Sequence, residues 1–438
     1  MSWAAFFQLR QHLRQSLWAV PLLGTAAGAG LARVDLWLDG QLTLPPGWTY
    51  SAGTASTVLA TIASAMVGLV GLVVTIGVLV VQMATGTLSP RFMRLWYRDR
   101  LQKLVLAAFI ATFAFSFALL RNVETGTVPN LGVSMAGAAV TIDLFLLLLY
   151  LDRFVHALRP VAVGAAMADA GLAIVGEMES KARAPATRTG AEWTRGDPDL
   201  RVRASRSGAI QAIHADGIVK LAVARGLVCI FPRTVGDFVT VGGVLADVYG
   251  PGSARDARRI RGMIALGRER TLDQDPAFAL RILVDIAIRA LSPAVNDPTT
   301  ATQMIDHMGA LLFGLGSVDP EGRGNFAGPD GQVRLAIPTR SWEDYLELGV
   351  HEIRQYGRTS PQTCRRLRAL LIDLEDAVLP GNRPAVRRHL LILDKTVAEA
   401  FLDSGERQFA LREYRQGIGG ASRSPGSDDA DGIPPDRP

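Results

Sequence analysis

Cysteine and the signature motifs of common enzyme classes are what this sequence lacks. Its two cysteines, Cys229 and Cys364, lie far apart, so the chain has neither a disulfide framework nor a cysteine metal cluster. A reducing compartment is the simpler interpretation for the half of the chain that carries them. No P-loop, G-x-S-x-G elbow or dinucleotide fingerprint is present, which argues against a hydrolase and a nucleotide-driven pump.

Metal and nucleic-acid signatures are missing as well. The six histidines show no HExxH motif and no paired spacing. The net charge of +5 is modest, and the basic residues are scattered without a stripe of interleaved aromatics. We therefore predict no catalytic residue, no metal, no cofactor and no nucleic-acid partner, and we favour a protein that is not an enzyme.

What the sequence does have is one long apolar run, from Thr57 to Val81. These 25 residues contain no ionisable side chain. As a helix with ~1.5 Å per residue the run extends over ~37 Å, more than the roughly 30 Å of bilayer hydrocarbon. A soluble core helix shows a polar face, whereas this run has only scattered Ser and Thr, whose hydroxyls can bond to their own helix. The run predicts a membrane span, with the lipid bilayer as a partner.

Small residues recur along this run at helical spacing. They are Ala60, Ser64, Gly68, Gly71 and Thr75. In lipid, helices associate by close approach of their backbones, so this stripe predicts a packing face. A fortuitous run of small residues is the alternative.

Three further segments complete four predicted spans, at about residues 13–36, 104–120 and 131–151. The first also resembles a signal peptide, so its cleavage stays an alternative. A basic loop lies between the second and third spans, and short basic loops are retained on the cytoplasmic side. Its basic residues are Arg91, Arg94, Arg98, Arg100 and Lys103. Both termini are then expected to be cytoplasmic.

One acid breaks the apolar pattern of the fourth span. Asp143 lies ~12 Å from the inner end of that span, where an exposed carboxylate is costly, so we expect it to face the interior of the bundle. As an intramembrane acid it is a candidate ligand for an ion or a proton; the structural alternative is a hydrogen bond to a neighbouring hydroxyl. The sequence offers no second buried charge as its partner.

The chain after the fourth span predicts a cytosolic α+β module. Residues 1–160 form the four-helix transmembrane domain, and residues 161–206 are expected to be a stalk helix and an arginine-rich linker. Short β-branched runs in residues 207–250 predict a small β-sheet or a half-barrel. Residues 251–415 predict a helical bundle, and the tail 416–438 is expected to be disordered.

Within the helical region, two helices are expected to begin at an Asp-Pro pair. Asp275 with Pro276, and Asp297 with Pro298, supply an N-cap and a first-turn proline. The sequence also predicts helices at about residues 254–266, 342–355, 361–377 and 385–401.

Polar residues gather around the second of these helix starts. They are Ser292, Asn296, Asp297, Thr299 and Thr300. The free N–H groups of a helix N-terminus suit an anion, so this cluster is our candidate site for a small ion or an anionic ligand. Simple helix capping is the more ordinary alternative.

Acidic residues precede the first of these helix starts. Glu269, Asp273 and Asp275 offer oxygen ligands of the kind that a divalent cation takes. Because Arg268 and Arg270 lie beside them, we favour a network of salt bridges over a metal site.

Four segments, in this order, resemble one family. They are VQMATGTLSPRFMR, SRSGAIQAI, VGDFVTVGGVLADV and RTLDQDPAFALRILVDIAIRALSPAVNDPTTA. Together they are similar to a bacterial family of predicted membrane proteins known as domain of unknown function 2254, over most of residues 80–301. The resemblance implies four spans and a cytosolic module, and it brings no established activity. For a bacterial protein with such spans we predict the inner membrane as its location.

Two functions from different classes stay open. The first is a homo-oligomeric inner-membrane channel or transport-type protein, with a pore lined by the second span and Asp143 and with a cytosolic module that assembles or gates it. The second is a membrane-anchored sensor or scaffold whose spans tether a ligand-binding cytosolic domain. A pore requires several copies with polar side chains turned to a common axis, whereas a tether does not.

Overall fold

The structure is a computed structural model, which describes residues 2–16, 18–39, 41, 49–87, 91, 99–124, 127–157, 159–181, 196–318 and 324–419. The chain folds into two compact units. The membrane unit comprises Phe6–Ala162, and the C-terminal unit comprises Val163–Pro438 together with Met1–Ala5. The chain therefore crosses from one unit to the other twice, after Ala5 and after Ala162.

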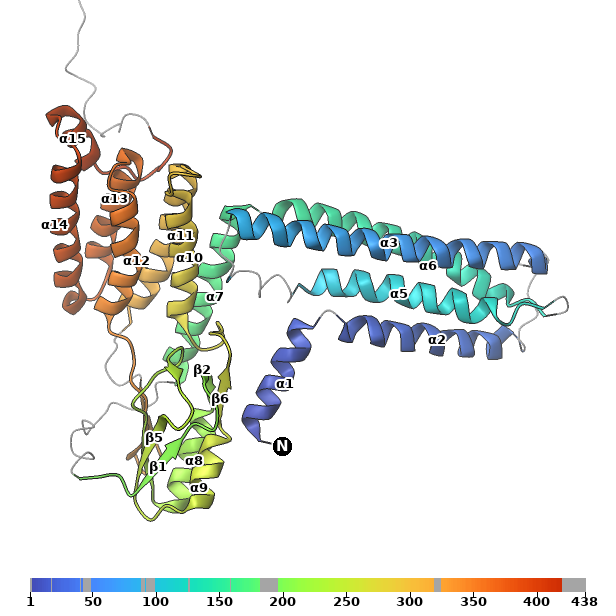
Figure 1. Cartoon of the computed structure of the whole chain (residues 1–438), viewed down its shortest axis with the longest axis horizontal. Helices are drawn as coiled ribbons and strands as arrows, with labels where there is room; N and C mark the ends of the chain where they lie inside the picture. Colours follow the sequence, from blue (N-terminus) through green and yellow to red (C-terminus); the bar gives the residue numbers. More distant parts are fainter. Residues whose placement is uncertain are drawn as a thin grey trace, which may run out of the picture. The chain divides into compact units, whose positions relative to one another are not determined.

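The membrane unit is a bundle of long helices in which α5 lies beside three others (Figure 1). The helices are α1 (Trp3–Gln15), α2 (Ala19–Asp39), α3 (Ala52–Thr87), α5 (Arg100–Leu120) and α6 (Asn130–Ala157). α5 packs against α2, α3 and α6. Their common core is built from large apolar side chains that are almost fully buried, among them Leu59, Phe109 and Leu119.

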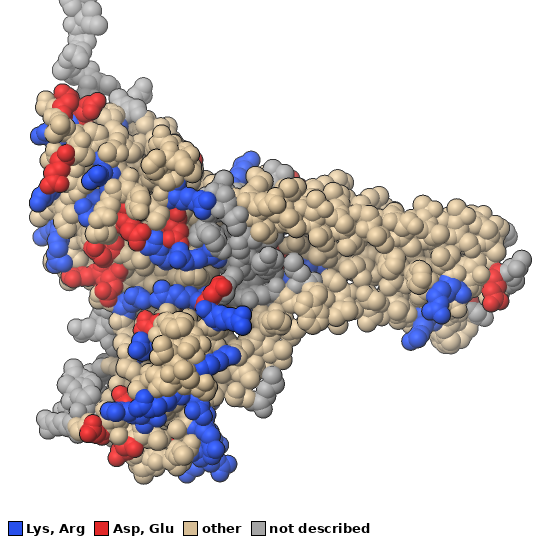
Figure 2. Space-filling view, viewed as in Figure 1, with Lys and Arg blue, Asp and Glu red and all other residues tan. Residues whose placement is uncertain are grey.

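Three of these helices correspond to the predicted second, third and fourth spans. α3, α5 and α6 are each long and apolar enough to cross a membrane. Figure 2 shows that the visible surface along the middle of the bundle is almost free of charged side chains, which suits contact with lipid.

The predicted first span, residues 13–36, is not one helix. α1 and α2 meet the criteria for a span only as a pair, bent by 72° at a break after α1. Pro21 in the first turn of α2 explains the break, because proline lacks the N–H that a continuous helix needs and its ring clashes with the carbonyl four residues earlier.

The predicted stalk, α7 (Pro160–Lys181), is the fourth helix that is long and apolar enough for a span. One face of it packs inside the C-terminal unit. A Cβ on Gly164 would lie 2.5 Å from the His307 ring, and a Cβ on Gly171 would lie 2.8 Å from Leu311. Both neighbours belong to α11 (Pro298–Gly316), so α7 is covered there by protein.

Glycine allows α2 and α5 to approach each other closely. A Cβ on Gly24 would lie 2.4 Å from the carbonyl oxygen of Ala107, and a Cβ on Gly28 would lie 2.2 Å from that of Ala111. Any larger residue would collide with the backbone of α5. This is the close approach by which membrane helices associate.

The C-terminal unit contains two small sheets. A five-stranded sheet has the order β1-β5-β3-β8-β7, and a three-stranded sheet has the order β4-β2-β6. Neighbouring strands are antiparallel, except that β3 and β8 are parallel. The strands are β1 (Leu200–Arg203), β2 (Gly208–Ile213), β3 (Val228–Ile230), β4 (Phe238–Val239), β5 (Val244–Tyr249), β6 (Ile264–Gly267), β7 (Asn325–Ala327) and β8 (Val333–Ala336). The mixed architecture with small sheets is therefore the one predicted.

Four strands, β1, β6, β7 and β8, lie outside the predicted β region of residues 207–250. β1 occupies the end of the predicted linker, because Val202 is buried against β5 while Arg201 points outward and pairs with Asp247 at 3.4 Å. β6 occupies the end of the helix predicted at 254–266. That helix, α9 (Ala254–Arg261), ends at Gly262, and the chain then pairs with β2. Residues 182–195 of the predicted linker lie outside the described residues.

The remaining helices are α8 (Ala215–Arg225), α10 (Pro276–Ala290), α11 (Pro298–Gly316), α12 (Trp342–Tyr356), α13 (Pro361–Ala377), α14 (Arg383–Ala400) and α15 (Ser404–Leu411). The helices predicted at 342–355, 361–377 and 385–401 agree with α12, α13 and α14 to within two residues. Most of the tail predicted to be disordered, from residue 420 on, lies outside the described residues.

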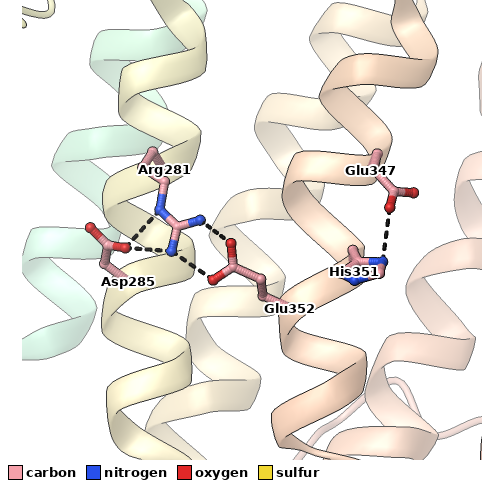
Figure 3. A network of polar contacts seen from close by, with 5 residues as sticks. All are labelled: Arg281, Asp285, Glu347, His351 and Glu352. Carbon is pink, nitrogen blue, oxygen red and sulfur yellow. Dashed lines mark hydrogen bonds and ion pairs between the residues drawn. The ribbon is translucent and has the colours of Figure 1, made fainter.

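An ion-pair network joins α10 to α12 (Figure 3). The Arg281 guanidinium pairs with Asp285 on its own helix at 2.5 Å, and two of its nitrogens donate to the two carboxylate oxygens of Glu352 on α12. The hydrogen bonds to Glu352 and Asp285 raise the pKa of Arg281 above its ordinary value. Such a bidentate pair fixes the relative rotation of two helices as well as adding stability.

Candidate functional site

α3 carries two opposite faces in the membrane unit. The buried face consists of apolar residues that contact the other helices: Ala55, Leu59, Ile62, Met66, Val73 and Val80. The opposite face, here called the small polar face, is exposed along the same helix: Thr57, Thr61, Ser64, Gly68, Gly71 and Thr75. The small polar set recurs at alternating steps of three and four residues, and the buried set recurs at steps of three, four or seven, so each follows one side of the helix over five turns or more.

The residues of the small polar face are exposed, and three of its hydroxyls bond to their own helix. The hydroxyls of Thr57, Thr61 and Thr75 each donate to the carbonyl oxygen four residues earlier, at 2.7–2.9 Å. Nothing within the described residues lies within 4 Å of a Cβ placed on Gly68 or Gly71. The stripe that the sequence predicted as a packing face is therefore unoccupied in a single described chain.

Asp143 lies in the interior of the bundle. It is 2% exposed, and its carboxylate shares a hydrogen bond with the side chain of Thr112 on α5. Its Oδ2 has no hydrogen-bond partner in the described part of the chain. The residue is thus placed away from the small polar face of α3, which points out of the bundle.

A second buried acid, Asp35, was missed from the sequence. It is 2% exposed, and neither of its carboxylate oxygens has a hydrogen-bond partner among the described residues. The sequence offered no second buried charge as a partner for Asp143, and Asp35 does not change that expectation. Asp35 lies against Gly132, which is eleven residues or ~16 Å along α6 from Asp143, so the two acids do not form a pair. The sequence held one signal for the burial of Asp35. Asp35 follows Gly28 by seven residues and so lies on the same face of α2 as the glycines that pack against α5.

The basic loop is only partly described, because Arg94 and Arg98 lie outside the described residues. Arg100 and Lys103 belong to α5 and not to a loop. Lys103 is buried and donates a hydrogen bond to the Arg14 carbonyl oxygen. At the start of α5, Asp99 accepts from the Leu101 N–H at 2.7 Å, which caps the helix and explains why it begins here.

The side chains of the polar cluster around residues 292–300 form hydrogen bonds with nearby backbone groups and with neighbouring side chains. Asp297 accepts hydrogen bonds from the N–H and the hydroxyl of Thr300, at 3.0 and 2.5 Å, and so caps α11. The Ser292 hydroxyl donates to the Arg289 carbonyl at 2.7 Å, and the Thr299 hydroxyl oxygen lies 3.3 Å from the Gln362 amide. Asn296 adopts a left-handed conformation, with φ of 47°, in the turn between α10 and α11. This geometry is that of a helix cap, and ligand binding here stays a prediction.

The C-terminal unit contains a cavity of about 250 Å³ that no sequence motif indicated. Its walls come from α7, the turn before α10, the loops after β2 and β8, and Trp3 near the chain start. Asp275 is one of the lining residues. Burial raises the pKa of its carboxyl above the ordinary range, and the charges of Arg270 and Arg340 offset part of that effect.

Metal binding finds no support in the described ranges. No group of three or more His, Cys, Asp or Glu side chains is placed there to hold an ion. Arg270 lies 3.7 Å from Asp275, so one of the acids before α10 has an arginine partner of the kind that the sequence favoured.

Comparison with known proteins agrees with the resemblance read from the sequence. A family model described as "Predicted membrane protein (DUF2254)" matches residues 14–373. Uncharacterised proteins of Mycobacterium tuberculosis and Mycobacterium bovis are each 29% identical over 417 residues, which cover 91% of this chain and 80% of theirs. No solved structure matches the chain.

Proposed function

We propose that this chain, which belongs to the DUF2254 family of predicted membrane proteins, is a homo-oligomeric channel or transport-type protein whose pore is lined by α3. The observation that supports this most is the small polar face. It is the exposed side of the most apolar helix in the chain, and nothing else in the described chain covers it.

The physical argument concerns what this face meets in a membrane. Lipid tails offer no hydrogen-bond partner to hydroxyls and gain little from contact with glycine, whereas other exposed residues of α3, among them Val67, Leu72 and Val74, are large and apolar and suit lipid. Several copies arranged with this face toward a common axis would bring hydroxyl and carbonyl oxygens together around it. Rings of such oxygens replace part of the water shell of an ion, which is how channel linings conduct.

The proposed pore does not include Asp143. Its carboxylate lies inside each bundle, bonded to Thr112, and the small polar face points the other way. We therefore move Asp143 from the pore lining to the interior of the subunit, where it and Asp35 are candidate proton ligands.

For orientation we propose the bacterial inner membrane, with both termini and the C-terminal unit in the cytoplasm. The arginines between α3 and α5 support this side by the rule that short basic loops stay cytoplasmic. Ion pairs connect side chains on the helices of the C-terminal unit. We propose that this unit assembles or gates the pore.

Ion flux into liposomes that contain the purified full chain tests the proposal. Thr75→Trp would place a bulky ring on the small polar face and is expected to abolish flux. Val74→Trp is the matched control, because residue 74 is exposed, adjacent in sequence and ~100° away around the helix. Asp143→Ala should conduct like the wild type. Absence of flux from wild-type protein, or equal loss in both Trp variants, would contradict the proposed pore.

A membrane-anchored ligand-binding sensor is the second candidate, and the cavity of the C-terminal unit favours it. In that case the spans are tethers, and the wild-type chain binds a ligand but conducts no ion. The flux measurement and a binding measurement together separate the two functions.

A further inference from the structure

The cavity of the C-terminal unit is lined by residues from both segments of the chain that connect the two units. Trp3 lines it, two residues before the first crossing, and Ile174 and Met178 line it from α7, the helix that contains the second crossing. The backbone N–H of Ala4 donates to the Gly262 carbonyl at 2.9 Å, which ties the start of the chain to this unit. A ligand in the cavity would therefore contact both segments that lead into the membrane unit.

The walls of the cavity carry an excess of negative charge. Four carboxylates line it, against one guanidinium, that of Arg340. The acids are Glu177, Asp216, Asp273 and Asp275. Charges around a concave site with low-dielectric walls focus the field inside it, so this lining favours a cation and disfavours an anion.

Asp275 is the most buried of these four acids. It stands at the N-cap position of α10, where the backbone N–H groups of Ala277 and Phe278 lower the pKa of its carboxyl without forming a hydrogen bond of capping geometry. The residue is 4% exposed, and its Oδ2 has no hydrogen-bond partner in the described part of the chain. Arg270 is 3.7 Å from this oxygen, but its Nε donates to the Gly236 carbonyl at 2.7 Å. Burial of a carboxylate is costly, and Arg270 and Arg340 offset only part of that cost, so a ligand ammonium group beside Asp275 would offset more of it.

Aromatic and apolar side chains complete the lining. Trp3 stacks on the His214 ring, with centroids 4.9 Å apart and planes 4° apart. Phe326 and Tyr345 also line the cavity. Aromatic faces attract organic cations and at the same time cover apolar groups, a combination that a bare metal ion does not exploit.

A metal ion does not suit this cavity. The four carboxylates are distributed around the walls, and no three acids, His or Cys in the described chain converge on one point. The volume of about 250 Å³ is just below the usual range of roughly 300–1,000 Å³ for small-molecule pockets, so it suits a compact organic molecule.

We propose that this cavity binds a small organic cation, an amine or guanidine on a compact aromatic or apolar body. The ammonium group lies at Asp275, and the body lies among the aromatic side chains. Binding itself does not depend on the pore. Its consequence for conduction, through Trp3 and α7, does rest on the proposed function.

Calorimetry on the full chain in detergent tests the binding without any flux measurement. The probes are three cations, tryptamine, phenethylamine and agmatine, and two analogues that keep the body of tryptamine but replace its charge, neutral tryptophol and anionic indole-3-acetate. At least one cation should bind, and for tryptamine the neutral analogue should be weaker by about tenfold, the cost of one lost charge pair. No binding by any of the three cations, or equal affinity for tryptamine and its two analogues, would overturn the proposal.

Variants locate the site. Asp275→Asn keeps the shape of the side chain and removes its charge, so the affinity for the bound cation should fall by about tenfold. Asp216→Asn, at an exposed position of the same wall, should weaken binding in the same direction and covers the case in which Asp275→Asn fails to fold. Glu375→Gln, an acid on α13 outside the cavity, should bind like the wild type. If Asp216→Asn and Asp275→Asn both bound the cation as tightly as the wild type, the cation would bind elsewhere and the proposed site would be refuted.

Discussion

α2 and α3 both carry glycine on one face, yet the two faces meet different surroundings. On α2, Gly24 and Gly28 lie so close to the backbone of α5 that no side chain fits between them. On α3, Gly68 and Gly71 face no atom of the described chain. The residue type is the same, and only the partner differs. The face of α2 is filled within one chain, and we infer that the face of α3 is filled by other copies.

The strongest way to break this comparison is to fill the face of α2. Gly28→Leu would drive a side chain into the Ala111 carbonyl, so we expect the bundle to lose about 3 kcal/mol of unfolding free energy. Thermal unfolding in detergent measures the loss. If Gly28→Leu unfolded at the same temperature as the wild type, α2 and α5 would not be in the close contact described above.

Gly68→Leu makes the same substitution on α3 and should act on association alone. Because nothing in the described chain lies near residue 68, thermal unfolding of the monomer in detergent should be unchanged. Self-association should weaken by about tenfold, or ~1.4 kcal/mol. Light scattering over a range of protein concentrations measures it. If the Gly68→Leu monomer were less stable than the wild type, or if the variant associated as strongly as the wild type, the face of α3 would not differ from that of α2 in the way inferred here.

Asp35→Asn sharpens the description of the α2 side of the bundle. A buried carboxylate without a hydrogen-bond partner is costly, so a neutral amide of the same shape should raise the unfolding free energy by about 1 kcal/mol. Asp143→Asn is the comparison, because Thr112 already partners that side chain and the gain should be smaller. Thermal unfolding of both variants in the same detergent decides the matter. Destabilisation by Asp35→Asn would reveal a partner for Asp35.

The smallest expected effect concerns the native cysteines. Burial raises the pKa of Cys229 and of Cys364 to about 12, so almost no thiolate forms at pH 8. Labelling of the folded chain with a thiol reagent should therefore be negligible, and labelling after unfolding should reach two thiols per chain. Fast labelling of the folded protein would show that the regions around Cys229 and Cys364 open to solvent. In that case both native cysteines would have to be replaced before cysteine probes are placed on α3.

Much of this fold follows from local sequence signals. The apolar run around Met66 and the Asp-Pro pairs at Asp275 and Asp297 identify α3, α10 and α11, because hydrophobic length and first-turn proline are properties of a few neighbouring residues. Long-range pairing is harder to predict. β1 is hidden among arginines and becomes a strand only because Val202 finds β5, and β6 becomes one only because the chain finds β2 after Gly262.

The functional features divide in the same way. The sequence indicated the small stripe on α3 and the acid in α6, since spacing and charge are visible in one helix. It did not indicate the cavity, which gathers Trp3, α7 and the turn before α10 from positions far apart along the chain. Nor did it indicate that Asp275 at the N-cap of α10 lines a cavity and lacks a hydrogen bond of capping geometry, because both depend on a side-chain rotamer that neighbouring elements decide.

Cross-linking along α3 tests the central claim most directly. Two single cysteines are introduced into the full chain in its native membrane, Thr75→Cys on the small polar face and Val73→Cys on the buried face of the same turn. With a bifunctional maleimide, the Thr75→Cys chains should form cross-linked multimers, and the Val73→Cys chains should stay monomeric. Monomers only from Thr75→Cys, or equal cross-linking of the two, would show that other copies of the chain do not cover α3.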